Sequence, residues 1–449
     1  MGFFILVIIM SNRNLYGLFL ESAGITTDSR NVKPGNIFFA LSGENFGGNR
    51  FSRQALENGC LYAVIDNREY YIPGKTLLVD NVLTALQELA AFHRKNFNIP
   101  VVAITGSNGK TTTKELMRDV LSSGYCVLAT KGNLNNHIGV PLTLLELNDN
   151  HEIAVIEMGA NHRGEIDLLC RIAEPTHGLI TNAGTAHLEG FGSPEGVLKA
   201  KSELFDYLKE TGGTIMLNYD QPNLREVVTG LKYKYIAFGS AENQFVYGKL
   251  NESAGYLNLS VMINYPEGKG NVPERSVDLN TKITGSYNYE NILAAVCTGA
   301  LFGIPAGDIK EAVEQYIPAN NRSQIAETPD NMLLLDAYNA NPDSMKAAIL
   351  HFTSMPGENK SVILGDMLEL GDYAKNEHQK IVELIANKGF REVLLVGNIF
   401  CSVSRPGSFI AFEKTEQLIE WLIGNPLRNR FILLKGSRGI GLERSISVL

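Results

Sequence analysis

One stretch, VVAITGSNGKTTTKELMRDVL at residues 101–121, constrains the fold of this chain more than any other. It opens with a short apolar, β-branched run typical of a buried strand, continues through a glycine-rich turn, and ends in the spacing of an amphipathic helix. A strand that leads through such a turn into a helix gathers backbone N–H groups and the positive end of the helix dipole at one point, which attracts anions. The stretch therefore predicts an α/β fold with an anion site at the turn.

The turn, TGSNGKTTT, ends in Gly-Lys-Thr as nucleotide phosphate loops do, but its glycine spacing is short. The usual loop has four residues between its first glycine and the Gly-Lys pair, whereas Ser107 and Asn108 alone separate Gly106 from Gly109. Glycines let a backbone approach a phosphate closely, and the lysine and threonine that follow suit phosphates and a magnesium ion. A generic turn with an exposed lysine is the alternative, but the strand, turn and helix together favour a phosphate site.

Composition excludes several classes of protein. The chain has 449 residues, enough for two to four domains, and 44% of them are hydrophobic, so each domain can bury a core. Its net charge of −8 gives no reason to expect a nucleic acid partner. Five scattered cysteines form no C-x-x-C pair, so we expect neither disulfides nor a zinc site, and a reducing cytoplasm fits best.

Short apolar runs alternate with helical stretches along the chain, and the pattern predicts three α/β domains. Residues 10–97 form a smaller N-terminal domain, and residues 98–317 form a central domain with a mostly parallel sheet. Near residues 240–285 the sequence changes to Gly, Asn and alternating residues, which predicts a small antiparallel section. Residues 318–449 form a third, Rossmann-like α/β domain.

Two polar residues follow predicted strands near the phosphate turn. Glu157 comes directly after IAVI, and His187 follows HGLITNAGTA, at the end of the next predicted strand. Ligands of open α/β sheets bind at the carboxyl ends of the strands, and a magnesium nucleotide needs hard ligands such as carboxylates. A solvent-exposed carboxylate and a loop histidine are the alternatives. Lys199 and Lys201 lie on a predicted helix, where lysines are usually solvated charges.

Longer stretches resemble the Mur ligase family, the ATP-dependent amide-bond ligases that build the bacterial cell-wall precursor. TGSNGKTTTKE and KGNLNNHIGVPLTLL resemble the family's ATP loop and the stretch after it, and EMGANHRGEID and TNAGTAHLEGFGSPEGVLKAKSEL continue the match. TDSRNVKPGNIFFALSGENFGGNRF is similar to its amino-terminal UDP-binding domain. DAYNANPDSMKAAI, ILGDMLELG and LLKGSRG resemble the member that adds D-alanyl-D-alanine. The resemblance covers nearly the whole chain from Met10, and the short glycine spacing is this family's form of the loop.

The resemblance implies a role for particular residues. It implies catalytic roles for Lys110, Glu157, His187 and Lys201, and a magnesium environment formed by Thr111, Glu157, His187 and Lys201. Lys201 matches a lysine that carries a carbamate in several family members. The implied ATP site comprises Gly106, Ser107, Asn108, Gly109, Lys110, Thr111, Thr112, Asn288, Asn291, Arg322 and Asp336, of which the last two come from the third domain. The implied substrate site comprises Ser29, Arg30, Asn339 and Asn341, the first two in the uridine-nucleotide pocket.

The resemblance also implies the reaction. The expected substrates are ATP with Mg²⁺, UDP-N-acetylmuramoyl-tripeptide and D-alanyl-D-alanine, and the expected products are UDP-N-acetylmuramoyl-pentapeptide, ADP and phosphate, made through an acyl phosphate. We expect a monomer in the cytoplasm with no nucleic acid partner and no stable membrane insertion. Whether the third residue of the tripeptide is diaminopimelate or lysine stays open.

Three departures from the family pattern affect details of the adenine and UDP contacts. Tyr287 stands where histidine is expected, Leu335 replaces the first of a paired Asp-Asp, and GGNRF stands where DGHDF is more usual. Three alternatives stay open: the sister ligase that adds the third amino acid, folylpolyglutamate synthetase, and a nucleotide-binding scaffold without catalysis. DAYNANPDSM argues against the first two, and the retained lysines, threonine, glutamate and histidine of the site argue against the third.

The apolar run FFILVIIM at residues 3–10 has no targeting architecture. A bilayer span needs about 20 apolar residues, and the run has neither the basic segment nor the cleavage site of a signal peptide. We expect residues 1–9 to be an upstream extension before a start at Met10. A short membrane-adhering tail and a buried edge strand are the alternatives.

Deletion of residues 1–9 is therefore predicted to leave ligase activity and solubility unchanged, because the family resemblance begins near Met10. Thermal melting of the full-length and shortened proteins tests this. A large fall in melting temperature on deletion would show that the run belongs to a core.

Overall fold

The computed structural model describes residues 12–43, 46–185, 187–251, 255–264, 275–319 and 321–449. The apolar run at 3–10 and the proposed start at Met10 lie outside these residues. The chain divides into two compact units, of which the first comprises Met1–Ala103, Cys126–Gly159 and Glu165–His177. The second comprises Ile104–Tyr125, Ala160–Gly164 and Gly178–Leu449. Within the described residues, no helix combines the length and the apolar character that crossing a membrane requires.

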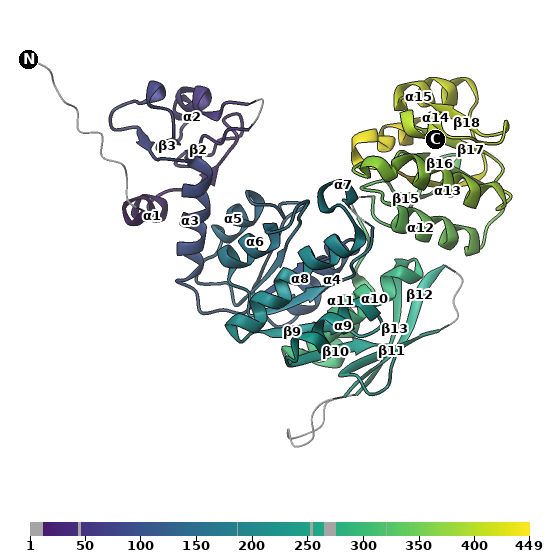
Figure 1. Ribbon diagram of the computed structural model, residues 1–449, viewed down its shortest axis with the longest axis horizontal. Coiled ribbons are helices and arrows are strands. Elements are labelled where there is room, and N and C mark those ends of the chain that lie inside the picture. The colour runs from purple at the N-terminus through teal and green to yellow at the C-terminus, as the bar shows by residue number, and fades with distance from the viewer. Residues whose placement is uncertain (1–11, 44–45, 186, 252–254, 265–274, 320) are drawn as a thin grey trace, which may run out of the picture. The chain divides into compact units, whose positions relative to one another are not determined.

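The N-terminal part is a four-stranded parallel sheet with strand order β1-β2-β3-β4 (Figure 1). Its core is made of small and apolar side chains, including Phe38, Ala63 and Ile65. Its elements are α1 (Asn12–Leu20), β1 (Ile25–Thr26), β2 (Ile37–Phe39), α2 (Ser52–Glu57), β3 (Tyr62–Ile65), β4 (Thr76–Leu78) and α3 (Val82–Arg94). Helix α3 follows β4, and its N-cap Asn81 accepts a hydrogen bond from the backbone N–H of Thr84.

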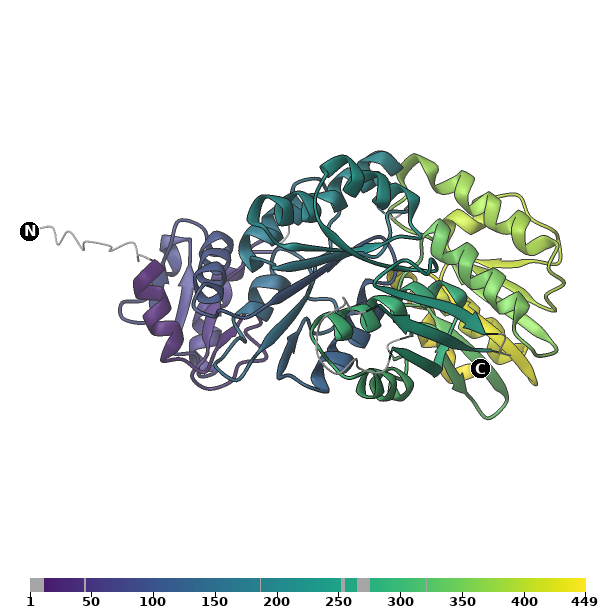
Figure 2. The same cartoon turned by 90° about the horizontal axis from the view of Figure 1, so that it is seen from below.

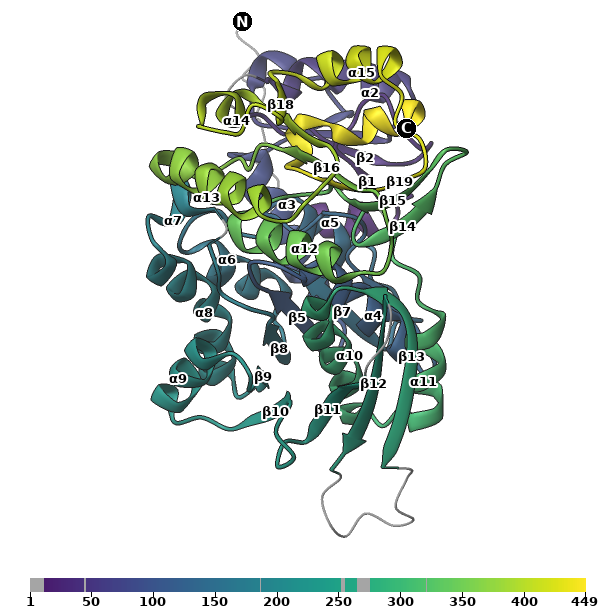
Figure 3. The same cartoon turned by 90° about the vertical axis from the view of Figure 1, so that its right-hand side faces the viewer.

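A nine-stranded sheet follows, with order β13-β12-β11-β10-β9-β8-β5-β7-β6. Its strands are β5 (Val101–Thr105), β6 (Val127–Ala129), β7 (Ile153–Glu157), β8 (His177–Ile180), β9 (Thr214–Asn218), β10 (Tyr235–Gly239), β11 (Val246–Asn251), β12 (Tyr256–Ile263) and β13 (Ser276–Thr284). The pairs β6–β7, β9–β10 and β10–β11 are parallel, whereas β11–β12 and β12–β13 are antiparallel. The antiparallel section predicted near residues 240–285 is confirmed, and its long strands stand beside α11 in Figure 3, with the same strands seen from below in Figure 2.

The helices of this region are α4 (Lys110–Ser122), α5 (Gly139–Leu144), α6 (Glu165–Ala173), α7 (Leu188–Phe191), α8 (Pro194–Thr211), α9 (Pro222–Leu231), α10 (Tyr289–Leu301) and α11 (Ala306–Gln315). Residues Asn291 to Ala300 of α10 are buried, and this helix packs against α4. A helix that is apolar nearly all round belongs inside a protein, so α10 is the central support of the phosphate-turn helix.

The C-terminal part is a six-stranded sheet with order β14-β15-β19-β16-β17-β18. Its neighbours pair in parallel, apart from the antiparallel pair of β14 and β15. Its elements are β14 (Gln324–Glu327), β15 (Asn331–Asp336), α12 (Pro342–Ser354), β16 (Lys360–Gly365), α13 (Ala374–Ala386), β17 (Val393–Val396), α14 (Asn398–Ser402), β18 (Ile410–Phe412), α15 (Thr415–Gly424) and β19 (Arg430–Lys435). Helices α12 and α13 cover one face of the sheet and α15 covers the other (Figure 3). The predicted α/β class with mostly parallel sheets is therefore confirmed.

Arg94 stabilises the first unit from the end of α3. The side chain is 5% exposed, and its guanidinium donates to the carbonyl oxygens of Ala173 at 3.0 Å, Ile99 at 3.0 Å and Phe97. It thus joins the ends of α3 and α6 to the segment that leads into β5. Buried carbonyl oxygens need donors, and one guanidinium supplies several.

Arg94→Met is therefore predicted to lower the free energy of unfolding by about 3 kcal/mol or more, since hydrogen bonds to a charged group contribute about 1.5–3 kcal/mol each. Denaturant unfolding measures the change. Arg53→Met, at an exposed arginine on α2, is the matched control. Equal, small losses in both variants would contradict this role of Arg94.

Candidate functional site

The phosphate turn between β5 and α4 depends on its two glycines. Gly106 has φ +146° and Gly109 has φ +80°, backbone angles that side chains disfavour. A Cβ on Gly106 would lie 1.9 Å from Oγ1 of Thr181, and one on Gly109 would lie 2.5 Å from Oδ1 of Asn291. Both neighbours approach the turn too closely for any larger residue. The turn is a concave strand-to-helix connection that the two glycines make possible.

Asn182 holds the turn in shape. Its side-chain Oδ1 accepts the backbone N–H of Asn108 at 2.9 Å, and its backbone carbonyl accepts the N–H of Ser107 at 2.9 Å. The hydroxyl of Thr181 donates to the carbonyl of Asn108 at 2.6 Å. The polar groups of the turn are therefore fixed by the segment that follows β8, and not by the turn alone.

The reactive residue types lie at the start of α4. The ammonium of Lys110 donates to the carbonyls of Gly106 at 2.6 Å and Ser107 at 3.2 Å, so the cation lies at the turn. Thr111 is buried, with 4% exposure, and Thr112 is half-buried in the same helical turn. A cation, backbone N–H groups and a hydroxyl at a helix N-terminus form a chemically suitable site for a polyphosphate.

A buried chain of amides lies beneath the turn. Thr113 Oγ1 donates to Asn291 Oδ1 at 3.0 Å, and Asn291 Nδ2 donates to Asn288 Oδ1 at 2.8 Å. Asn288 Nδ2 then donates to the carbonyl of Thr284 at 2.7 Å. The two asparagines predicted at the adenine region thus lie under the glycine turn with their side chains hydrogen-bonded to protein. Whether they also contact a nucleotide stays a prediction.

The unusual tyrosine at 287 and the leucine at 335 are both buried in the second unit. The hydroxyl of Tyr287 shares a hydrogen bond of 2.8 Å with Oγ of Ser323, and burial strongly raises the pKa of this phenol. Leu335 is 4% exposed and belongs to the core of the C-terminal sheet. These two departures from the family pattern therefore fill structural positions.

Asp336, predicted to meet a ribose, is an ion-pair partner of a residue that the sequence did not single out. Lys435 Nζ lies 2.6 Å from Asp336 Oδ2, and the lysine side chain is 2% exposed. Lys435 also donates to the carbonyl of Asn339 at 3.3 Å. Arg322 stacks on Tyr338, with its Cζ 3.7 Å from the ring centroid. The predicted residues Arg322, Asp336 and Asn339 therefore lie close to Tyr338 and Lys435.

Asn341 contacts the phosphate turn directly. Its Nδ2 donates to Oδ1 of Asn108 at 2.7 Å, and its Oδ1 caps α12 by accepting the N–H of Ser344 at 2.9 Å. Two residues on, Asp343 Oδ2 accepts both the backbone N–H and the hydroxyl of Thr185, each at 2.8 Å. The N-terminus of α12 thus contacts the turn and the segment that holds it.

His187 lies beyond the end of its predicted strand, and Lys201 lies on a helix as predicted but is buried. His187 does not end a strand, since β8 ends at Ile180, and it precedes the first residue of α7 with φ +56°. Its Nδ1 lies 2.5 Å from Oε2 of Glu369, a contact that lowers the pKa of the Glu369 carboxyl. Lys201 is 1% exposed and donates to the carbonyl of Ala160 at 3.3 Å, whereas Lys199 is exposed. The solvated-lysine alternative holds for Lys199 and is wrong for Lys201.

Glu157 ends β7 as predicted, and it is buried and not a solvent carboxylate. It is 1% exposed, its Oε1 accepts Asn135 Nδ2 at 2.7 Å, and its N–H donates to Thr130 Oγ1 at 3.0 Å. These partners belong, with Glu157, to the first unit. The exposed-carboxylate alternative is therefore wrong.

Ser29 and Arg30 lie in the N-terminal part. Ser29 is buried and its hydroxyl donates to Oε1 of Gln54 at 3.2 Å. Arg30 is exposed and pairs with Asp28, with Nε 2.9 Å from Oδ1, and its hydrogen bonds lower the pKa of that carboxyl to about 2. Arg30 is thus accessible to a ligand, and the uridine-nucleotide role of both residues stays a prediction.

Comparison with known proteins identifies the family. The model described as Mur ligase family, catalytic domain, matches residues 21–94, that of the Mur ligase middle domain matches 104–299, and that of the Mur ligase, glutamate ligase domain, matches 321–438. These matches together span most of the chain. This chain belongs to the Mur ligase family.

Relatives within the Mur ligase family are similar over nearly their whole length. The UDP-N-acetylmuramoyl-tripeptide–D-alanyl-D-alanine ligases of Bacillus subtilis (strain 168) and Escherichia coli (strain K12) are each 36% identical to this chain. The match to the Bacillus subtilis protein covers 95% of this chain and 93% of that protein. The match to the Escherichia coli protein covers 98% of this chain and 96% of that protein. A crystal structure of MurF from Acinetobacter baumannii is 30% identical with a TM-score of 0.85, covering 98% of each chain. MurF ligase from Thermotoga maritima in complex with ADP is 26% identical with a TM-score of 0.82, covering 96% of this chain and 97% of that one.

Sequence reasoning missed the residues that hold the Mur ligase site together. Asn182, Glu369 and Lys435 contact predicted site residues, and Asp343 contacts Thr185. All four lie within stretches that resemble the family, but no role was predicted for any of them. TNAGT after a strand and DSM after a helix-starting proline were the available signals, and each is common in loops and helix caps.

Within the described part of the chain, no group of three or more His, Cys, Asp or Glu side chains could hold a metal ion. Magnesium binds through one or two carboxylates together with substrate phosphates, so this result is compatible with a magnesium nucleotide.

The Asp336–Lys435 pair gives a stability prediction. Removing one partner of a buried ion pair leaves an uncompensated charge and costs about 3–5 kcal/mol, so Asp336→Ala is predicted to lower the free energy of unfolding by that amount. The double variant Asp336→Asn with Lys435→Met removes both charges and is predicted to recover most of the loss. Denaturant unfolding tests both variants, and an equal loss in each would refute the pairing argument.

Proposed function

We propose that this chain is an ATP-dependent ligase that joins D-alanyl-D-alanine to UDP-N-acetylmuramoyl-tripeptide in peptidoglycan precursor synthesis. The observation that carries the proposal is the glycine turn with Lys110 at its helix N-terminus, in a chain that matches D-alanyl-D-alanine-adding ligases from end to end. The two relatives that are 36% identical to this chain are both named for that activity. The products are UDP-N-acetylmuramoyl-pentapeptide, ADP and phosphate.

The reaction proceeds through an acyl phosphate because a free carboxylate is a poor acyl donor. A carboxylate oxygen of the tripeptide attacks the γ-phosphorus of ATP, the bond to the β,γ-bridging oxygen breaks, and ADP leaves. The amine of D-alanyl-D-alanine then attacks the acyl carbon, and the tetrahedral intermediate expels phosphate as the amine loses a proton. Holding the reactants in register supplies up to about 7–11 kcal/mol of the barrier reduction.

Lys110 and the backbone of the glycine turn stabilise charge on the transferring phosphoryl group. Their contribution is electrostatic and depends on being in place before the reaction. The short hydrogen bonds of Lys110 to the turn carbonyls hold its ammonium at the site in the absence of nucleotide. Excluding water from the closed site protects the acyl phosphate from hydrolysis.

A magnesium ion fits the chemistry of the proposed donor set. Thr111 would offer a hydroxyl, Glu157 a carboxylate and His187 an imidazole, and both Thr111 and Glu157 are buried. When bound, magnesium neutralises phosphate charge and orients the γ-phosphoryl group. Lys201 would join this set as a carbamate, formed when its amine adds to carbon dioxide and loses a proton.

The remaining site residues are assigned by the same proposal. Asn288 and Asn291 lie near the adenine, Arg322 and Asp336 contact the phosphates and ribose, and Ser29 and Arg30 bind the uridine nucleotide. Asn339 and Asn341 contact the peptide substrates. The proposed domains are 10–97 for UDP-substrate binding, 98–317 for ATP binding and 318–449 for ligation, in a cytoplasmic monomer.

Release of ADP is the readout that tests this function. ADP is predicted to form at a substantial rate only when ATP, UDP-N-acetylmuramoyl-tripeptide and D-alanyl-D-alanine are all present. A panel of tripeptides with diaminopimelate or lysine at the third position identifies the natural substrate. ADP formation with another amino acid donor, and none with D-alanyl-D-alanine, would assign the chain to a sister ligase.

Lys110→Ala is predicted to abolish ligation while leaving the melting temperature unchanged, because the ammonium lies at the turn and the side chain is only half-buried. Lys199→Ala, at an exposed lysine on α8, is the control that keeps full activity. Wild-type turnover of Lys110→Ala at saturating ATP would refute the phosphate-site assignment.

A further inference from the structure

The segment after β8 is contacted from two directions. We call residues 181–185 together with His187 the β8–α7 segment. On one side it contacts the glycine turn, since Asn182 accepts from Asn108 and the N–H of Gly184 donates to Oγ of Ser107 at 2.9 Å. On the other side it contacts the C-terminal part through Thr185 and His187. It is therefore a physical link between the phosphate turn and residues 341–371.

Asp343 makes one of these C-terminal contacts, through two hydrogen bonds. One carboxylate oxygen, Oδ2, accepts two hydrogen bonds of 2.8 Å from Thr185, one from its backbone N–H and one from its hydroxyl. The carboxylate approaches so closely that a Cβ on Gly184 would lie 2.4 Å from it. Hydrogen bonds to an ionised acceptor are about twice as strong as neutral ones, and an acidic residue in the first turn of α12 is favoured by the helix dipole.

A second carboxylate contacts the same segment. Glu369 Oε2 lies 2.5 Å from Nδ1 of His187, and the carbonyl of Glu369 accepts the N–H of Glu189. Both Glu369, with φ +63°, and His187, with φ +56°, adopt the left-handed conformation that is uncommon outside glycine. Such backbone conformations cost energy and persist where surrounding contacts determine them. The C-terminal part therefore constrains the end of the β8–α7 segment, at Thr185 and His187.

We infer that Asp343 is a positioning residue for ligation, acting on the phosphate turn through Thr185, Gly184 and Ser107. This inference rests on the proposed function, because it assumes that the turn binds the triphosphate. When the C-terminal part contacts the segment, the Thr185 hydrogen bonds fix Gly184, and the Gly184 N–H fixes the Ser107 hydroxyl at the turn. The role assigned to Asp343 is to couple placement of the C-terminal part to the geometry of the turn, without contact to the reacting atoms.

The test combines amide hydrogen exchange with steady-state kinetics on full-length protein. In nucleotide-free enzyme, Asp343→Ala is predicted to speed deuterium uptake at Thr185 and Gly184, and this readout does not depend on activity. In the ligase assay it is predicted to lower kcat by about ten- to a hundredfold, with KM for UDP-N-acetylmuramoyl-tripeptide nearly unchanged. Asp343→Asn, which keeps an acceptor oxygen, is predicted to restore most of the kcat, and Glu358→Ala on the exposed surface is the matched charge control.

A double-mutant cycle with Thr185→Val completes the test. If Asp343 acts through Thr185, the double variant is predicted to lose no more kcat than Asp343→Ala alone. The inference would be overturned if the kcat losses of the two single variants added up in the double variant, or if Asp343→Ala kept the wild-type kcat. It would also be overturned if Asp343→Ala lowered the melting temperature along with kcat, since the loss would then come from unfolding. Absence of ligation by the wild-type protein would instead refute the proposed function, and the exchange result would still decide whether Asp343 holds the segment.

Discussion

The close approach of Gly109 to Asn291 is the contact on which the nucleotide site depends. With 2.5 Å between Asn291 Oδ1 and the place where a Cβ would stand, the turn can rest on α10 only because residue 109 has no side chain. The same oxygen accepts the hydroxyl of Thr113, so one buried amide contacts both the turn and the first turns of α4. Helix α10 therefore helps to set the conformation of the phosphate turn. A buried polar network whose groups are all hydrogen-bonded favours a single arrangement of its side chains.

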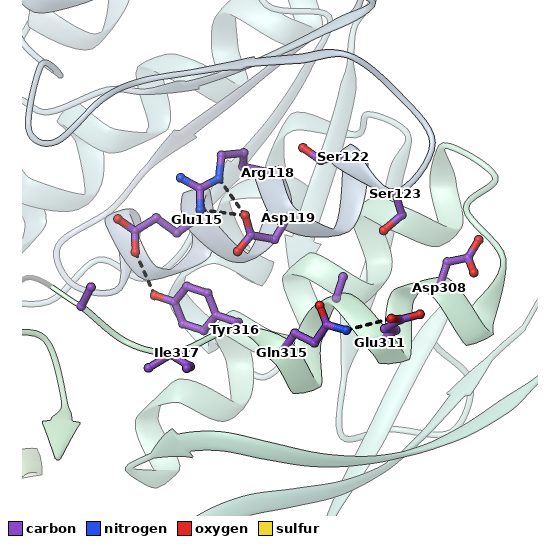
Figure 4. Close-up of a pocket in the computed structure, with 12 residues that line it drawn as sticks. Glu115, Arg118, Asp119, Ser122, Ser123, Asp308, Glu311, Gln315, Tyr316 and Ile317 are labelled. Atoms are coloured by element: carbon purple, nitrogen blue, oxygen red, sulfur yellow. Dashed lines mark hydrogen bonds and ion pairs between the residues drawn. The ribbon is translucent and has the colours of Figure 1, made fainter.

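A cavity of about 760 Å³ lies between α4 and α11, lined by polar and acidic side chains that include Glu115, Asp119 and Glu311 (Figure 4). Tyr316 donates a hydrogen bond to Glu115 at 2.8 Å, and burial, together with the Glu115 charge, strongly raises the pKa of the tyrosine. This bond joins α4 to the end of α11, where the chain leaves toward the C-terminal part.

Local sequence predicted the elements well but not the contacts between distant segments. The strand, glycine turn and helix at residues 101–121 were predicted because their signals are local, and the antiparallel section showed its alternating pattern in β12 and β13. The burial of Lys201 was not predictable from α8, since it depends on Ala160 and Phe191, which reach it through the fold. Asp336 and Lys435 both lie in stretches that resemble the family, but their ion pair was not predictable. It depends on the pairing of β15 with β19, strands that lie about 100 residues apart in the sequence. Pairings of this kind depend on sheet order, which a single sequence does not encode locally.

The central claim is that the amide network under the glycine turn holds it ready for a triphosphate. Calorimetric titration of the nonhydrolysable ATP analogue AMP-PNP with magnesium into wild-type and Asn291→Leu protein tests it most directly. Leucine keeps the volume of asparagine approximately but removes its hydrogen bonds, so the account predicts nucleotide affinity weakened by about tenfold or more, with UDP-N-acetylmuramoyl-tripeptide affinity unchanged. Equal nucleotide affinity in the two proteins, with both fully folded, would contradict the account.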